Sequence, residues 1–164
     1  MERERKFLVL HPPAGFRKKP NRRIEQGYLT ITSKGRGGTE QVRVRREYGR
    51  FILNAKRGTG ASRHEAESPL PAAAGKILWP LTEGFRLQKT RYRIPFRRHV
   101  IELDVYHGSL ARLMTAEVEF SSMKALRAFK PPAWFDRELT DLNGWSNSDL
   151  AAKGRPDKKR HRRF

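Results

Sequence analysis

The sequence contains no cysteine, and it has no apolar run long enough to cross a membrane. A disulfide framework and a metal site built from thiolates are therefore excluded. A membrane-spanning helix needs about 20 predominantly apolar residues, and the charged start of the chain does not have the form of a signal peptide. We therefore expect a cytoplasmic protein without membrane contact. Its 164 residues are enough for one domain with a hydrophobic core.

Acidic residues are scarce relative to basic ones: 17 Asp and Glu stand against 36 Lys and Arg, which gives a formal net charge of +19. Such a charge predicts an anionic partner, which could be nucleic acid, a phosphate compound or an acidic surface. Part of the excess lies in the tail at 153–164, which holds seven basic residues and one acidic residue. We expect this tail to be disordered because it is nearly devoid of apolar residues. It would then be either a weak contact for nucleic acid or polyphosphate, or only a solubilising terminus.

Charged residues recur two positions apart, a spacing that places side chains on one face of a β-strand. The first example is Glu2, Glu4 and Lys6, followed directly by the apolar residues 7–10. Apolar residues stand between many of the charges, so each stretch has a charged face and a largely apolar face. This pattern favours a closed sheet with a polar interior and an apolar exterior covered by helices. The other stretches with this spacing are 43–45, 63–67, 89–93, 102–104 and 117–119.

The order of the predicted elements is mainly β. The prolines at 12 and 13 end the first strand, and the glycine-rich residues 33–39 predict a hairpin turn. A phosphate-binding P-loop is a poor match there because the Gly-Lys-Ser/Thr ending is absent. The expected fold is α+β, mainly β, with an eight-stranded antiparallel closed barrel flanked by helices. The predicted strands are 2–10, 24–33, 41–46, 50–56, 63–68, 85–95, 100–106 and 114–120, and the predicted helices are 69–80, 121–129 and 146–152.

These stretches, taken in order, resemble the CYTH superfamily of triphosphate tunnel metalloenzymes. Glu2-x-Glu4-x-Lys6 resembles the ExExK signature of that family, and the likeness covers residues 1–152, which we predict to be the tunnel domain. ExExK alone is a weak pattern, whereas the ordered set that ends in a second ExE is specific. The further matching stretches are Gln26-Gly27-Tyr28-Leu29, Arg43-x-Arg45, Lys56, Arg63-x-Glu65-x-Glu67, Lys89-Thr90-Arg91-Tyr92, Glu102-Leu103-Asp104-Val105, Ala116-Glu117-Val118-Glu119-Phe120, Trp134 and Glu138-Leu139-Thr140.

A buried triphosphate requires several fixed cations, because an uncompensated charge in a protein interior is very unfavourable. Arginine forks suit phosphate oxygens bidentately, and lysine supplies a point charge. The cations on the charged strand faces must also be interleaved with carboxylates or with a bound anion. The candidate phosphate-binding residues are Lys6, Arg43, Arg45, Lys56, Lys89 and Arg91, with Arg63 and Arg93 in reserve.

The carboxylates on the same strand faces are hard oxygen ligands, which favour Mg²⁺ or Mn²⁺ over Zn²⁺ in a chain without cysteine. The resemblance implies that Glu4 and Glu119 are the central metal ligands. Glu2, Glu117 and the Glu65–Glu67 pair would then be secondary ligands or ligands of a second metal. Asp104 would either assist a metal or neutralise a neighbouring arginine.

The resemblance also implies a catalytic pair between Lys6 and Tyr28. In that pair the tyrosine would set the protonation state that lets Lys6 help to activate water or assist the leaving phosphate. The alternative is that Tyr28 only packs against its own strand.

The expected function is the divalent-metal-dependent hydrolysis of inorganic triphosphate to diphosphate and phosphate. One alternative within the family is a thiamine or nucleoside triphosphatase. An alternative from another class is a binding module that holds polyphosphate or RNA without turnover. The clustered glutamates argue against this last reading, because a pure anion binder gains nothing from them.

Overall fold

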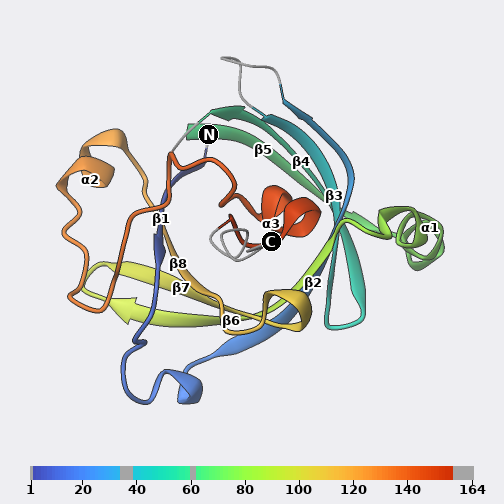
Figure 1. Ribbon diagram of the computed structural model, residues 1–164. Helices are drawn as coiled ribbons and strands as arrows, with labels where there is room; N and C mark the ends of the chain where they lie inside the picture. Colours follow the sequence, from blue (N-terminus) through green and yellow to red (C-terminus); the bar gives the residue numbers. More distant parts are fainter. Residues whose placement is uncertain (1, 34–38, 60–61, 157–164) are drawn as a thin grey trace, which may run out of the picture.

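The computed structural model describes residues 2–33, 39–59 and 62–156. Eight strands in this part of the chain close into a barrel in the order β1-β5-β4-β3-β2-β6-β7-β8, with β8 paired to β1. Every neighbouring pair is antiparallel, and Figure 1 looks into the barrel. The predicted fold is confirmed. The strands are β1 Glu2–Leu8, β2 Asn21–Ser33, β3 Thr39–Glu47, β4 Arg50–Thr59, β5 Ser62–Leu70, β6 Arg86–Phe96, β7 His99–Tyr106 and β8 Met114–Glu119.

The helices are short, and two of them lie outside the barrel wall. In Figure 1, α1 projects from one side of the barrel and α2 from the opposite side, whereas α3 lies within the outline of the barrel. α2 begins at the predicted position, where the Ser122 hydroxyl accepts a hydrogen bond from the Ala125 N–H and caps the helix. The helices are η1 Phe16–Lys18, α1 Ala72–Leu78, η3 Pro80–Thr82, η4 Gly108–Leu110, α2 Met123–Ala128 and α3 Asn147–Lys153.

The outer face of β1, β6, β7 and β8 carries the larger apolar core. Phe7, Ile101 and Val118 are buried there, and the segment that follows α2 packs over them. Phe135 contacts the ring of Phe7 at a centroid distance of 4.6 Å, and Trp134 contacts Phe135 edge-on. This aromatic pair therefore covers the outside of the barrel.

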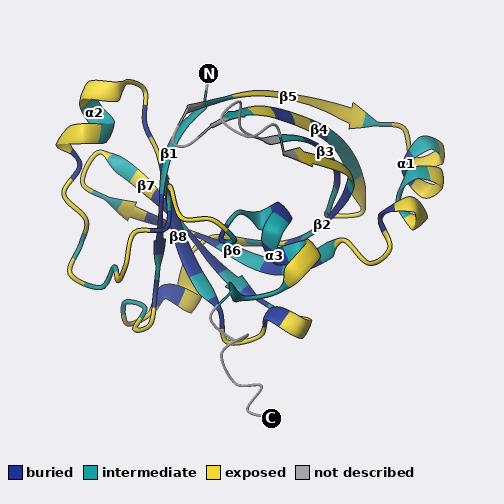
Figure 2. Ribbon diagram, turned by 45° about the horizontal axis from the view of Figure 1, so that its top comes forward, coloured by how far each residue is buried: buried dark blue, intermediate teal, exposed yellow. Residues whose placement is uncertain are grey.

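A second apolar cluster fills one end of the lumen. Leu87 and Tyr106 share the inward face of their strands with charged residues, and they pack with Leu150 of α3. The lumen therefore changes from charged to apolar along its length, and α3 closes the apolar end (Figure 2). The sequence predicted this helix but did not place it inside the barrel.

The segment 136–140 completes the wall beside β1. β1 pairs with β5 at Glu2 and Arg3, and further along the strand the segment takes over this edge. The N–H of Leu139 donates to the carbonyl of Lys6 (2.7 Å), and the N–H of Leu8 donates to the carbonyl of Arg137 (2.8 Å). The segment then leads to α3 in the lumen, and Thr140 and Asn147 from this part of the chain line the cavity.

No helix among the described residues is long and apolar enough to cross a membrane.

The predicted end of the tunnel domain at residue 152 falls one residue before the end of α3 at Lys153. Residues 157–164 of the predicted basic tail lie outside the described residues.

Candidate active site

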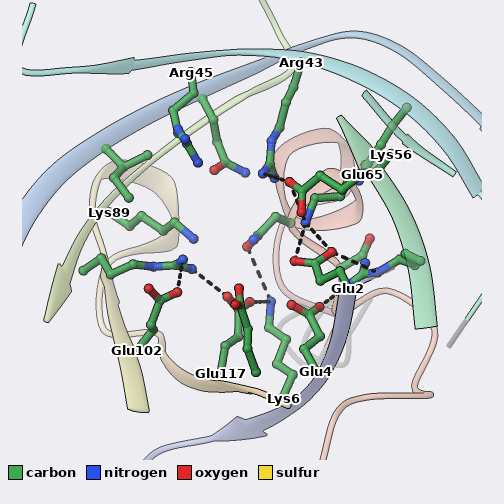
Figure 3. A pocket seen from close by; sticks show the side chains of 18 of the residues that line it. Glu2, Glu4, Lys6, Arg43, Arg45, Lys56, Glu65, Lys89, Glu102 and Glu117 are labelled. Carbon is green, nitrogen blue, oxygen red and sulfur yellow. Dashed lines mark hydrogen bonds and ion pairs between the residues drawn. The ribbon is translucent and has the colours of Figure 1, made fainter. Parts of the chain in front are cut away.

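The lumen contains a cavity of about 340 Å³ to which each of the strands β1–β8 contributes a charged or polar side chain. The alternation of side chains along a strand explains this, since every second residue of each strand faces inward. Arg43 and Arg45 reach into the cavity from one wall, and Glu102, Glu117 and Glu4 face them from the other (Figure 3). We call the wall with Arg43 and Arg45 the cationic side and the wall with Glu4, Glu102 and Glu117 the acidic side, although Lys6 lies among these carboxylates and Glu65 lies beside Arg43.

Arg43 is the clearest indication of a bound anion. Its side chain is buried, with 7% of the residue exposed. The Nη2 atom lies 3.7 Å from a Glu65 oxygen, which is too long for a hydrogen bond, and Nε has no hydrogen-bond partner within the described ranges. A buried guanidinium normally has its donors satisfied, so an anion in the cavity would complete this site.

Asp104 binds two of the lumen cations, Lys89 and Arg91. This carboxylate is completely buried. It accepts from Lys89 Nζ at 2.5 Å and from Arg91 Nε and Nη2 at 2.7 Å. Burial alone would raise the pKa of Asp104, but the charges of Arg91 and Lys89 lower it. Asp104 does not line the cavity, so it neutralises an arginine and a lysine, which is one of the two roles expected for it.

Lys89 loses its proton more easily than an ordinary lysine, despite its contact with Asp104. Burial and the neighbouring Arg91 charge lower the pKa of Lys89 to about 8. Arg91 remains charged at all relevant pH values. One of the two cations beside Asp104 can therefore lose its proton just above neutral pH.

Glu117 connects the acidic side to the cations. It lies 3.2 Å from Lys6 Nζ and 2.6 Å from Arg91 Nη2. Burial alone would raise the pKa of Glu117, but Lys6 and Arg91 lower it well below its usual range. Burial would likewise lower the pKa of Lys6, but Tyr106 and Glu117 raise it above its usual value. Both groups are therefore charged at neutral pH.

Glu119 is the carboxylate with the least support from cations. Burial and the nearby charges of Glu102 and Glu2 raise its pKa. Glu119 also stands directly opposite Glu4 in the pairing of β1 with β8, and like charges at opposed positions repel each other. A cation between these groups would relieve the repulsion.

The carboxylates around Glu119 fit a hard divalent cation, because such a cation prefers oxygen ligands. It would also offset the repulsion that Glu119 experiences from its acidic neighbours. The ligands are not preassembled, however: no group of three acidic or histidine side chains in the described part of the chain could hold a metal ion. Glu4 forms an ion pair with Arg63, and Glu2 accepts from Lys56 Nζ at 2.9 Å. Metal binding would therefore require these carboxylates to change partners.

The barrel brings most of the predicted site residues into one cavity. Glu65 and Glu67 lie on the β5 side, where both accept from the Asn54 amide. Arg93 does not line the cavity and is exposed. The predicted residues that line the cavity are Glu2, Glu4, Lys6, Arg43, Arg45, Lys56, Arg63, Glu65, Glu67, Lys89, Arg91, Glu117 and Glu119.

The expected contact between Lys6 and Tyr28 is not the one that forms. The hydroxyl of Tyr28 accepts from Gln26 Nε2 at 2.7 Å, and Tyr28 does not line the cavity. Lys6 instead contacts Glu117 and donates to Asn147 Oδ1 at 3.4 Å. The strand order explains the difference, because β1 and β2 lie on opposite sides of the closed barrel. The tyrosine that lies near Lys6 is Tyr106, whose hydroxyl donates to the same Asn147 oxygen as Lys6 Nζ.

Several residues of the site were not selected from the sequence. Glu102 forms an ion pair with Arg91 and lines the cavity. Its position two residues before Asp104 would have been sufficient to find it. Thr140 and Asn147 also line the cavity, but they come from the C-terminal segment, whose sequence carries no alternating charge pattern.

A closed eight-stranded barrel with cations and carboxylates in its lumen defines a triphosphate tunnel protein. A scan against family models gives no match, but individual proteins are clearly similar. An inorganic triphosphatase of Nitrosomonas europaea is 40% identical over 153 residues, which cover 92% of this chain and 96% of that protein. An inorganic triphosphatase of Acetivibrio thermocellus is 35% identical over 127 residues, which cover 76% of this chain and 77% of that protein.

Solved structures agree with the sequence comparison. The crystal structure of an inorganic triphosphatase matches with a TM-score of 0.67 at 37% identity, over 93% of this chain and 95% of that one. A Pyrococcus horikoshii structure matches with a TM-score of 0.56 at 16% identity, over 83% and 94% of the two chains, and shows the fold alone. The chain therefore belongs to the inorganic triphosphatase family of CYTH tunnel proteins. Membership implies a hydrolase that acts on phosphoanhydride bonds, and in general a dependence on a divalent metal.

Proposed function

We propose that this protein hydrolyses inorganic triphosphate to diphosphate and phosphate in the presence of Mg²⁺ or Mn²⁺. The observation that carries the proposal is the buried, incompletely satisfied Arg43 on one wall of the cavity, with the carboxylates Glu4, Glu102 and Glu117 on the opposite wall. An anion needs the first wall, and a divalent cation accompanying that anion needs the second. A site for a simple anion would have no use for the carboxylates.

Cations from different strands would bind the phosphate oxygens of the substrate. Arg43 and Arg45 present guanidinium groups to phosphate oxygens from β3, and from β6 Lys89 presents an ammonium group and Arg91 a guanidinium group. Lys6 is charged and lies beside Glu117, so it would donate a hydrogen bond to the leaving phosphate rather than remove a proton from water. These fixed charges would hold the phosphoanhydride in position and stabilise the charge that develops on its oxygens.

Glu4 and Glu119 are proposed as the central metal ligands, with Glu2, Glu102 and Glu117 close to them. When bound, Mg²⁺ or Mn²⁺ would neutralise charge on the phosphate oxygens and lower the pKa of a coordinated water. Glu65 and Glu67 interact with Asn54, Lys56 and Arg45, so we propose that they orient the cationic wall.

Phosphate release should be measured with inorganic triphosphate, ATP and thiamine triphosphate, each with Mg²⁺, Mn²⁺ or EDTA. We expect rapid release from inorganic triphosphate with either metal and none in EDTA. A preference for ATP or thiamine triphosphate would keep the reaction class and change the substrate. Anion binding that is insensitive to EDTA, without release from any of the three, would contradict the proposal and favour a binding module.

The activity should decline on the alkaline side because of Lys89. The pKa of Lys89 is lowered to about 8 by burial and by Arg91, so this lysine loses its charge as the pH rises through that value. Triphosphate binds the protonated form better, so kcat/KM should fall above pH 8. The kcat/KM profile reports the pKa values of the free enzyme. In Lys89→Arg the falling limb should move to higher pH, and an unchanged limb would show that another group titrates.

A further inference from the structure

Asn147 is the first residue of α3, and it faces the cavity from the helix that closes the apolar end of the lumen. Two donors converge on its amide oxygen. The Tyr106 hydroxyl donates to Oδ1 at 2.6 Å, and Lys6 Nζ lies 3.4 Å from the same atom. The amide thus connects the closing helix to Lys6, which the proposed function places beside the leaving phosphate.

The orientation of this amide follows from the chemistry of its neighbours. A lysine ammonium has three donors and no acceptor, so the atom of Asn147 that faces Lys6 must be the oxygen. Tyr106 supports the same orientation by donating to that oxygen, while its own oxygen lies 3.4 Å from the Thr115 hydroxyl. The two N–H donors of the amide –NH₂ group therefore take no part in the contacts with Lys6 and Tyr106.

The backbone around Asn147 and Lys6 is fixed as well. The N–H of Lys6 donates to the Thr140 hydroxyl at 3.0 Å, and the carbonyl of Lys6 accepts from Leu139. The start of α3 is capped by Ser146, whose hydroxyl accepts from the Asp149 N–H. Because both residues sit on a rigid support, the amide is preorganised rather than adaptable.

We propose that Asn147 is a substrate-binding residue whose –NH₂ group donates to an oxygen of the phosphoryl group nearest the closed end of the lumen. Tyr106 is the positioning residue that keeps the amide oxygen turned toward Lys6. Among the strongly charged side chains of the cavity, this amide supplies a neutral donor. A terminal phosphate that approaches α3 would be recognised there without a further cation. The inference rests on the proposed function, because it assigns one contact within that same site.

Asn147→Asp separates a binding role from a structural one. Aspartate has nearly the same shape and can still accept from Tyr106 and Lys6, and an acidic residue in the first turn suits the positive end of a helix. It loses the –NH₂ donors, however, and places a negative charge toward the phosphate. We expect the dissociation constant and KM for triphosphate to rise on the order of 100-fold, with an unchanged or higher melting temperature.

Two further variants complete the test. Asn147→Ala should raise KM about five- to tenfold, the effect of losing one neutral hydrogen bond. Asn143→Asp is the matched control, since it adds the same charge at an exposed position outside the cavity. It should leave KM within about twofold of the wild-type value, the scale of a surface substitution.

Triphosphate binding should be measured by calorimetry in EDTA, together with turnover in Mg²⁺. If the wild type binds and hydrolyses triphosphate and Asn147→Asp does the same with equal constants, the role of Asn147 is wrong and the proposed function stands. If Asn147→Asp is impaired no more than Asn143→Asp, the effect is one of net charge, and the inference is likewise overturned. If the wild type neither binds nor hydrolyses triphosphate, the proposed function itself fails.

Discussion

Glu119→Gln should abolish metal-dependent hydrolysis while leaving the metal-free protein at least as stable as the wild type. The activity is lost because the amide oxygen is a poorer ligand for a hard cation than a carboxylate. Loss of this metal ligand should lower kcat/KM roughly 1000-fold. Stability moves in the opposite direction, because the pKa of Glu119 is raised by burial and by Glu102 and Glu2. A raised pKa means that the ionised carboxylate is less favourable in the folded protein than in the unfolded chain.

The pair of measurements is kcat/KM with Mg²⁺ and thermal unfolding in EDTA. Glu83→Gln is a suitable control, because it removes one negative charge at an exposed position outside the cavity. Its activity should match that of the wild type. Retention of more than a tenth of the wild-type kcat/KM in Glu119→Gln would show that this carboxylate is not a central ligand.

Asp104→Asn should produce the largest loss of stability in the site. The substitution leaves Lys89 and Arg91 as buried cations without the carboxylate that they share. Breaking a buried ion pair by removing one partner costs about 3–5 kcal/mol, so the free energy of unfolding at neutral pH should fall by that amount. Chemical denaturation in EDTA measures it directly.

The same variant tests whether the lumen holds an anion. Diphosphate would replace part of the lost negative charge, so it should stabilise Asp104→Asn more than it stabilises the wild type. Glu138→Gln provides the comparison with a more exposed ion pair, in which Glu138 binds Arg5 at 2.6 Å. That change should cost less than about 1 kcal/mol. Equal losses in the two variants would contradict the account of the Asp104 network.

The stability difference should also depend on pH in a defined direction. The pKa of Asp104 is lowered on folding despite burial, because Arg91 and Lys89 favour its charged form. Its contribution is therefore complete above the pKa of the unfolded chain and is lost as the pH falls through the pKa of the folded protein. The wild type and Asp104→Asn should approach each other in acid.

The sequence was sufficient to predict the barrel and most of the charged residues that line its lumen. Glu2, Glu4 and Lys6 face inward because every second residue of a strand does so, and the same rule places Arg43 and Arg45. The ordered resemblance to a family extended this local rule to the whole chain. The alternation of residues along a strand predicts which side chains share a face, and this prediction does not depend on where the strand lies in the sheet.

What local periodicity does not report is which strands face one another. The expected contact between Lys6 and Tyr28 does not form for this reason: β1 and β2 are consecutive in sequence but lie across the barrel from each other. A catalytic role for the two residues stays a prediction. Tyr106 on β7 reaches the neighbourhood of Lys6 instead.

The contacts of the C-terminal segment with Lys6 were not predicted, for a related reason. In its contacts with Lys6, the N–H of Leu139 donates to the Lys6 carbonyl, the Thr140 hydroxyl accepts from the Lys6 N–H, and Asn147 accepts from Lys6 Nζ. No spacing of charges marks these groups. The position of α3 depends on Leu87, Tyr106 and Leu150 packing together, which is a long-range contact between elements that look ordinary in isolation.

The most direct test of the central claim is a ³¹P NMR time course of inorganic triphosphate with the wild-type protein, in Mg²⁺ and in EDTA. We expect the triphosphate signals to disappear in Mg²⁺ while diphosphate and orthophosphate appear in equal amounts. In EDTA we expect the spectrum to stay unchanged. Intact triphosphate in Mg²⁺, or an equal rate in EDTA, would contradict the assignment of the lumen as a metal-dependent triphosphatase site.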